Sequence, residues 1–279
     1  MHAIAVSLYV RGENYMKRSS SITAYHLKWI ALLTMTYDHL FKLFQIDILA
    51  MLQTMLAASE YDYEPYYAMY LLLGIGRLSF PIYAFLVAQG CHHTHNLRAY
   101  ILRLGAFALL SELPFQLLIA ELNEVPVSFH LALGNIFVTL CLGAMTCGLF
   151  EAGKRSTLAP WVSWILIAML VWLGALLDCD YGPFGILLIL VCYISKTKKQ
   201  LALGFILALT GMTLFYQSWP LEDWVYDLST QGILLLASIS VLYWLLRYQG
   251  EQGKRFGYAI YAYYPVHLLV LIGLYHLLH

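Results

Sequence analysis

The sequence predicts an all-α fold, a polytopic integral membrane helical bundle with about nine transmembrane helices. Of 279 residues, 61% are hydrophobic and only 11% are charged, whereas a soluble domain has roughly 25% charged residues. Apolar runs recur along the whole chain, and a helix needs about 20 apolar residues to cross the hydrocarbon core. The basic residues collect between alternate runs, as they do on the cytoplasmic side of membrane proteins.

The apolar runs give the expected spans in chain order. They lie near residues 29–57, 66–90, 99–119, 131–150, 159–177, 183–195, 201–217, 231–247 and 256–278. The first run is long enough to contain an interfacial turn around Gln45 to Asp47, and the sixth run is short. We expect residues 1–25 to form a cytoplasmic tail and residues 26–279 to form one transmembrane domain. No internal repeat of the kind that builds transporters from inverted halves is evident.

The charges between the runs predict a cytoplasmic N-terminus. All but two of the 16 basic residues fall in the tail or beside alternate loops: Arg11, Lys17, Arg18, Lys28, Arg98, Arg103, Lys154, Arg155, Lys196, Lys198, Lys199, Arg247, Lys254 and Arg255. The other loops are acidic: Glu60, Asp62, Glu64, Glu121, Glu124, Asp178, Asp180, Glu222, Asp223 and Asp227. The net charge is zero, so no nucleic-acid partner is expected. We interpret the five cysteines as buried thiols, since they show no framework spacing.

Polar residues interrupt several of the apolar runs between mid-depth and the outer surface. They are Asp38, Arg77, Glu112, Asn135, Asp180 and His267. At 1.5 Å per residue, Asp38 lies roughly half way across the bilayer. An ionisable side chain at that depth needs a partner and indicates a functional site. One polar cavity that collects all six residues is the economical interpretation.

The stretch TMTYDHLFKLF, residues 34–44, carries the densest group of these charges. Asp38 and Lys42 are four residues apart on one helical face and can pair, whereas Asp38 and His39 point roughly 100° apart. Asp38 with Lys42 or Arg77 could therefore be a neutralised structural pair, and His39 a histidine hydrogen-bonded between helices. Glu112 with Arg77 could be a second structural pair or a base held by its partner.

The stretch CHHTHNLR, residues 91–98, forms a second polar group at the cytoplasmic end of the second run. No acidic partner stands at ligand spacing beside the histidines, so no metal is expected. His93, His95, Arg98 and Arg103 lie at two helix ends, where they can bind phosphates. The alternative is that these residues only anchor the topology.

Five segments together resemble the TraX family, which is named for the conjugative F-type pilin acetylase. They are LKWIALLTMTYDHLFKL, GRLSFPIYAFLVAQGCHHTHNLRAYILRLGAFALLSELPFQLL, GNIFVTLCLG, DYGPFGILL and YAYYPVHLL, and the resemblance covers roughly residues 26–275. It implies a multi-pass protein of the bacterial cytoplasmic membrane that transfers acetyl from acetyl-CoA to an amine of a pilin-like or other exported acceptor. The family positions carried over are Asp38, His39, Arg77, His93, Arg98, Glu112, Asn135, Asp180 and His267.

The residues and the resemblance together predict a mechanism. The nucleotide of cytoplasmic acetyl-CoA would dock at the basic ends, His39 or His267 would act as base, and Arg77 or Asn135 would stabilise the oxyanion. Direct transfer and an acetyl-histidine intermediate both remain open. Two other classes remain as alternatives: a proton-coupled small-molecule transporter, which also buries charges, and a non-enzymatic membrane assembly partner.

Overall fold

The computed structural model describes residues 22–57, 62–125, 133–216, 224–254 and 256–279. Most of the expected tail, together with Glu60, Glu222, Asp223 and Arg255, lies outside these ranges. Every regular element within them is a helix. In chain order these are α1 Ala24–Leu43, α2 Gln45–Met55, α3 Glu64–Gly76, α4 Ser79–His93, α5 Leu97–Leu122, α6 Ile136–Lys154, α7 Pro160–Leu176, α8 Gly182–Ile194, α9 Lys198–Tyr216, α10 Trp224–Ser240, α11 Leu242–Leu245 and α12 Ala259–Leu278. The all-α prediction is confirmed.

Within the described ranges, six helical segments are long and apolar enough to cross a membrane. They are Glu64–His93, Leu97–Leu122, Ile136–Lys154, Lys198–Tyr216, Val225–Leu245 and Ala259–Leu278. Pro160–Leu176 and Gly182–Ile194 are apolar but shorter. The chain is therefore a multi-pass membrane protein. The expected count of nine spans and the cytoplasmic N-terminus remain predictions.

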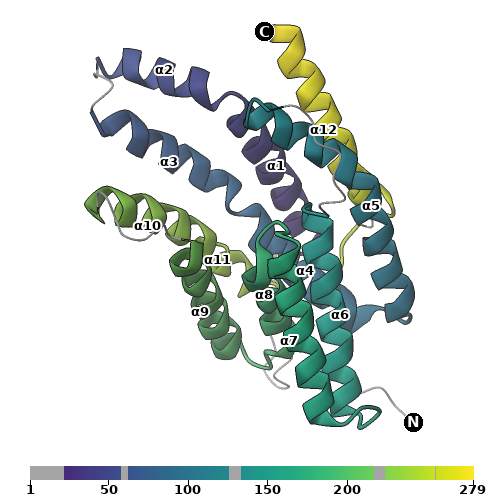
Figure 1. Cartoon of the computed structure of the whole chain (residues 1–279). Coiled ribbons are helices and arrows are strands. Elements are labelled where there is room, and N and C mark those ends of the chain that lie inside the picture. The colour runs from purple at the N-terminus through teal and green to yellow at the C-terminus, as the bar shows by residue number, and fades with distance from the viewer. Residues whose placement is uncertain (1–21, 58–61, 126–132, 217–223, 255) are drawn as a thin grey trace.

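The helices form one bundle with α4, α6 and α8 at its centre. Helix α6 packs against α5, α7 and α8, and α4 packs against α1 and α8. Figure 1 shows α12 beside α5 on one side, and α9, α10, α3 and α2 on the other. Gly143 on α6 faces Ile189 on α8, where any larger residue would overlap that side chain. Small residues of this kind let membrane helices approach closely.

Three of the predicted apolar runs are broken helices, one of which is the run 231–247, broken at Val241 between α10 and α11. The first run breaks at Phe44, between α1 and α2, next to the expected turn. The second run breaks at Arg77 and Leu78, between α3 and α4. A single regular span through Arg77 would be the simplest interpretation of the sequence, but the structure interrupts the helix there. In a membrane, irregular backbone is tolerated only where it is buried in protein or lines a cavity.

The bundle has two ends of opposite charge. The end that we call the basic end carries the start of α1 and the connections α4–α5, α6–α7 and α8–α9, and there Ala24 N donates to Glu251 O at 2.8 Å. At the opposite, acidic end, His276 contacts Glu121 at 3.2 Å and His279 contacts Asp47 at 3.5 Å. The polar residues predicted to share a cavity lie between this acidic end and the middle of the bundle.

Candidate functional site

Two histidines from opposite ends of the chain meet in the bundle. Nδ1 of His39 on α1 lies 2.9 Å from Nε2 of His267 on α12, and both side chains are buried. Nδ1 of His267 lies 3.0 Å from the carbonyl oxygen of Tyr263. The sequence left these histidines as alternative bases, and the structure shows that they form a single pair.

The hydrogen bonds of this pair determine which nitrogen is free. A carbonyl oxygen only accepts, so Nδ1 of His267 donates to Tyr263 O, and Nε2 of a neutral His267 must accept. Nδ1 of His39 therefore donates to His267. Since charging a buried imidazole is costly, we infer two neutral rings, with the free lone pair on Nε2 of His39.

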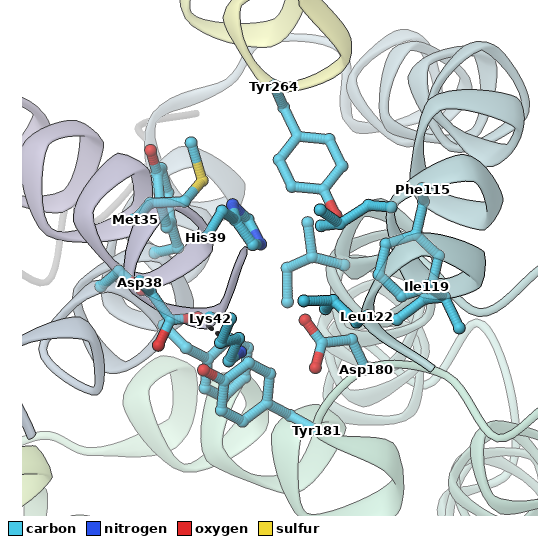
Figure 2. Close-up of a pocket in the computed structure, with 15 residues that line it drawn as sticks. Met35, Asp38, His39, Lys42, Phe115, Ile119, Leu122, Asp180, Tyr181 and Tyr264 are labelled. Carbon is cyan, nitrogen blue, oxygen red and sulfur yellow. Dashed lines mark ion pairs between the residues drawn. The ribbon is translucent and has the colours of Figure 1, made fainter. Parts of the chain in front are cut away.

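His39 lines a cavity of about 110 Å³, which we call the first cavity. Its polar lining residues are Asp38, His39, Lys42, Ser79, Tyr83, Asp180, Tyr181 and Tyr264. Figure 2 shows the ring of His39 pointing into the space between Tyr264 and Asp180. His267 is not among the lining residues, so it contributes to the site through its hydrogen bond to His39.

Four charged side chains form a cluster at this cavity, and three of them, Asp38, Lys42 and Asp180, line it. Lys42 Nζ lies 2.6 Å from Asp38 Oδ2, as the helical spacing predicts. Gly76 packs directly against Asp38, where an added Cβ would overlap the carboxylate. Arg77 interacts electrostatically with Asp38, Asp180 and Tyr181. Two acidic and two basic groups thus balance, which limits the cost of burying them.

The loop from Asp178 to Gly182 brings Asp180 to the cluster. Asp178, Tyr181 and Gly182 all have positive φ, of 47°, 61° and 47°. This conformation is strained for a tyrosine and is typical of functional loops. Tyr181 stacks on Phe80 with ring centroids 3.7 Å apart. Burial raises the pKa of Asp180, which lies in this loop, to about 6.

The loop is tied to the start of α6. The amide of Asp180 donates to Gly134 O at 2.7 Å, and the hydroxyl of Thr139 donates to the carbonyl oxygen of Asp180. Asn135 accepts from Phe137 N at 3.0 Å and so caps α6. The position of Asp180 is therefore set by α6 as well as by its own loop.

Glu112 and Asn135 form a brace between α5 and α6. Asn135 Nδ2 lies 2.7 Å from Glu112 Oε2 and 2.7 Å from Ala108 O. Gln116 and the amide of Gly134 both donate to Glu112 Oε1. The two amide hydrogens of Asn135 are thus engaged, and the described contacts of Glu112 pair it with these groups instead of with Arg77. Neither residue lines the first cavity.

The predicted phosphate ligands lie together at the basic end, but in different settings. His95 and Arg98 are exposed beside Asn96, which caps α5 by accepting from Ala99 N at 3.0 Å. His93 Nδ1 lies 2.7 Å from Gln89 O of its own helix. Arg103 is partly buried, with its guanidinium 5.5 Å from the ring centroids of Tyr258 and Tyr261.

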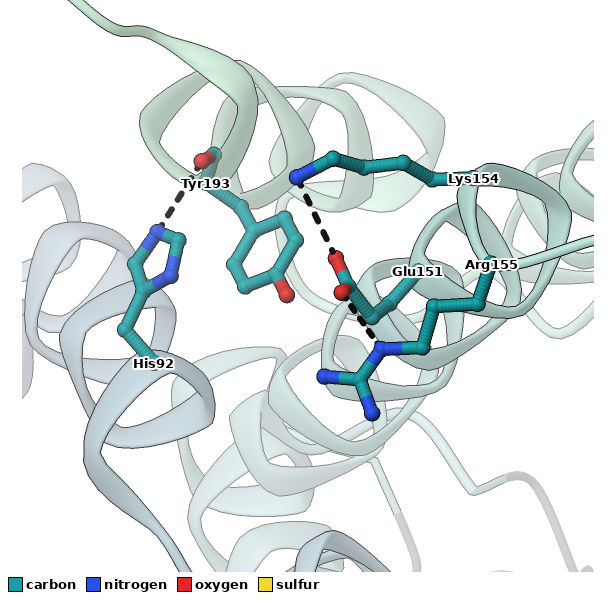
Figure 3. A network of polar contacts seen from close by, with 5 residues as sticks. All are labelled: His92, Glu151, Lys154, Arg155 and Tyr193. Atoms are coloured by element: carbon teal, nitrogen blue, oxygen red, sulfur yellow. Dashed lines mark hydrogen bonds and ion pairs between the residues drawn. The ribbon is translucent and has the colours of Figure 1, made fainter. Parts of the chain in front are cut away.

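Next to these residues lies a polar network that the sequence analysis did not single out. His92 Nε2 lies 3.0 Å from Tyr193 O, and the two rings stack with centroids 4.1 Å apart (Figure 3). Glu151 pairs with Arg155 at 2.7 Å and with Lys154 at 3.9 Å. Among the described residues, no group of three or more His, Cys, Asp or Glu side chains is arranged to hold a metal ion.

Four polar residues of the first cavity were missed by the sequence analysis: Ser79, Tyr83, Tyr181 and Tyr264. The last two are the most informative. Both lie in segments that carry predicted site residues, DYGPFG and YAYYPVH. Tyrosine is common in this chain, with 22 copies, so residue type alone could not have distinguished these two. The available signal was that each tyrosine lies close in sequence to a predicted site residue, Tyr181 to Asp180 and Tyr264 to His267.

The fold and the site define a multi-pass helical membrane protein with a buried, charge-balanced cavity that is lined by a histidine. The family model for TraX protein matches residues 24–275, and the chain belongs to the TraX family. The resemblance predicted from the sequence is thereby confirmed. The chain is also similar to the probable fimbrial assembly protein FimC, serogroup H1, of Dichelobacter nodosus. The two are 29% identical over 265 residues, which cover 92% of this chain and 97% of that relative. No solved structure gives a significant match.

Proposed function

We propose that this chain is an acetyltransferase that moves acetyl from acetyl-CoA to an amine, with His39 as the general base. The observation that carries the proposal is the His39–His267 pair. It leaves the lone pair of His39 Nε2 directed at a polar cavity that Lys42 and Tyr264 also line. A neutral imidazole held in one tautomer by a second group is well suited to remove a proton near pH 7.

The proposed reaction uses the groups of the first cavity in order. The amine nitrogen attacks the thioester carbonyl carbon, and a C–N bond forms while His39 Nε2 takes the amine proton. The ammonium of Lys42 stabilises the oxyanion that develops, and Arg77, which lines a second, adjoining cavity, acts through its interaction with Asp38 and Asp180. The oxyanion then collapses, the C–S bond breaks, and His39 returns the proton to the thiolate to give free CoA. Transfer without an acetyl-histidine is the simpler route, because the site needs only positioning and one base.

The proposed donor enters from the basic end, which we assign to the cytoplasm. His95 and Arg98 are exposed there beside the N-terminus of α5, a position that favours phosphate groups. His93 and Arg103 would extend this surface, and Tyr258, which is 68% exposed, offers a ring on which a base can stack. Under this assignment the N-terminus is cytoplasmic and the acidic end faces the acceptor.

The proposed acceptor is the amine of a pilin-like or other exported protein. Support comes from the printed name of the relative, a probable fimbrial assembly protein. The same name favours the second candidate, a non-enzymatic assembly partner. That candidate predicts that substitutions at His39 leave function intact, whereas an acetyltransferase requires the histidine.

Release of CoA thiol from acetyl-CoA tests the proposal. Purified protein, given a peptide with a free N-terminal amine, should release thiol and yield the acetylated peptide. His39→Ala should lower kcat by about 10²-fold to 10⁴-fold, the usual contribution of a general base. His276→Ala is the matched control, since His276 is an exposed histidine at the acidic end.

Membrane vesicles of known sidedness test the orientation in the same assay. Inside-out vesicles that are loaded with the acceptor peptide should consume added acetyl-CoA, and right-side-out vesicles with the same peptide outside should not. Folded wild-type protein that neither releases thiol nor modifies the peptide would contradict the acetyltransferase assignment. Equal activity of His39→Ala and wild type would contradict the role of His39.

A further inference from the structure

A second cavity lies on the other side of the Asp178–Gly182 loop. Its volume is about 450 Å³, against about 110 Å³ for the first cavity. Phe115, Asp180 and Tyr181 line both cavities and so form the wall between them. Nothing in the proposed chemistry of the first cavity uses this larger space, yet the two spaces share Asp180.

The charged groups of the second cavity favour a cation. Arg77, Asp178 and Asp180 are its charged lining residues, so acidic groups exceed basic ones there. Arg77 already interacts with Asp38 and Asp180. Asp178 is exposed in the same loop. A bound ammonium would therefore meet carboxylates at the point where the two cavities adjoin.

The rest of the lining is largely apolar and comes from two helices. Leu209 and Met212 of α9 line the cavity together with Leu234 and Leu235 of α10. A smaller polar group, which includes Thr213 and Gln231, provides hydrogen-bonding side chains beside them. Ligand sites commonly combine an apolar wall with a few placed polar groups. The lining thus matches a ligand that carries both a cationic amine and an apolar group.

We propose that the second cavity binds the acceptor, a primary ammonium that carries an apolar group, as at the N-terminus of a polypeptide with an apolar first residue. This assignment rests on the proposed acetyltransferase function. The ammonium lies against Asp178 and Asp180, while the apolar group packs between α9 and α10. Asp180 is then a positioning residue that holds the ammonium at the wall shared with the first cavity. The ammonium first releases one proton to water at the acidic end, and the neutral amine then reacts while His39 takes a second proton.

Filling the second cavity should separate acceptor binding from donor binding. We would compare wild type with Leu234→Trp, whose larger side chain occupies the cavity, and with Leu236→Trp, which lies 68% exposed on the same helix. Thiol release would be measured against a peptide with an N-terminal leucine and against acetyl-CoA. In Leu234→Trp the indole takes the space of the acceptor's apolar group. The loss of that group's packing should raise the peptide KM about tenfold or more. The KM for acetyl-CoA, and both constants in Leu236→Trp, should stay within about twofold of wild type.

Two further substitutions keep the test decisive. If Leu234→Trp does not fold, Leu234→Ala removes apolar contact and should raise the peptide KM several-fold. Asp178→Asn should raise it roughly threefold, as expected for one exposed charge, whereas Glu124→Gln at the same end should not. A peptide with an N-terminal aspartate should be a poorer acceptor than the leucine peptide.

The outcomes separate this inference from the proposed function. A wild-type enzyme that transfers acetyl while the cavity variants keep its peptide KM would overturn the second-cavity assignment alone. Parallel increases in the KM for peptide and for acetyl-CoA would also overturn it. A wild-type protein without thiol release would remove the proposed function, and the assignment with it.

Discussion

Two ion pairs with the same helical spacing lie in opposite settings in this molecule. Asp38 and Lys42 on α1 are four residues apart and 2.6 Å from each other, and Glu151 and Arg155 at the end of α6 are four residues apart and 2.7 Å from each other. The Asp38 side chain is 9% exposed, whereas the Arg155 side chain is 71% exposed. Spacing and distance are nearly equal, so only the surroundings distinguish the pairs.

The comparison shows that burial, and not helical spacing, determines how much an ion pair contributes to the stability of this bundle. Water screens the exposed pair at the basic end, which contributes little to stability. The buried pair is desolvated, so each charge depends on its partner and on Arg77 and Asp180. Removing one member of the buried cluster therefore unbalances the others, while the basic end tolerates changes one at a time.

Removal of the buried carboxylate should have the largest effect. Asp38→Ala leaves Lys42 and Arg77 without their shared counter-charge, and we expect a loss of about 3–5 kcal/mol in the free energy of unfolding. Unfolding by SDS titration in mixed micelles measures this loss. Glu151→Gln is the matched change in the exposed pair and should leave the unfolding curve unchanged.

A double variant sharpens the same prediction. Asp38→Leu with Lys42→Met removes both charges and should be less destabilising than Asp38→Ala alone, since replacing a buried pair costs less than breaking it. Equal losses in the free energy of unfolding in Asp38→Ala and Glu151→Gln would contradict the prediction that the buried pair matters more for stability than the exposed pair.

Loss of the supporting histidine should have the next largest effect. His267→Ala removes the acceptor that fixes the tautomer of His39, and kcat for thiol release should fall roughly 10-fold to 100-fold, as for other orienting partners. His267→Gln should recover part of the rate, because an amide can accept from His39 and donate to Tyr263 O.

The pH profile separates orientation from simple packing. The rate of His267→Ala should also show a changed dependence on pH, since the surroundings of His39 differ. A rate loss equal in the Ala and Gln variants, with an unchanged pH profile, would mean that His267 serves packing alone.

The smallest effect is expected at the basic end. Arg98→Ala removes one exposed phosphate ligand, and the KM for acetyl-CoA should rise roughly threefold, with a weaker salt dependence and an unchanged kcat. Lys199→Ala, an exposed basic residue at the same end, is the control. A fall in kcat at unchanged KM would contradict a binding role for Arg98.

Local spacing predicted part of the site. The i, i+4 relation of Asp38 and Lys42 predicted their ion pair, because helical geometry brings those side chains to one face. Asn135 lies near the start of the predicted run 131–150, and it caps α6 there. These relations depend on a few neighbouring residues, so they can be inferred without the rest of the fold.

Pairs across the bundle were less predictable. His39 and His267 are 228 residues apart, and the sequence offered them only as alternatives. Glu112 was weighed with Arg77, but it lies against Asn135, because α5 packs on the start of α6. Each of these outcomes depends on which helices are neighbours, and periodicity along one helix carries no information about that.

The sequence by itself determined the all-α membrane architecture, the family and the uneven distribution of charge. The architecture follows from composition and from the requirement that backbone groups in lipid be satisfied within a helix. The family follows from the five segments that resemble it in fixed order. Only the tertiary structure decided that the second run breaks at Arg77, which histidine faces the first cavity, and that a second cavity shares Asp180 with it. The physical reason is that packing between distant segments sets both the burial of a charge and the hydrogen bonds left to it.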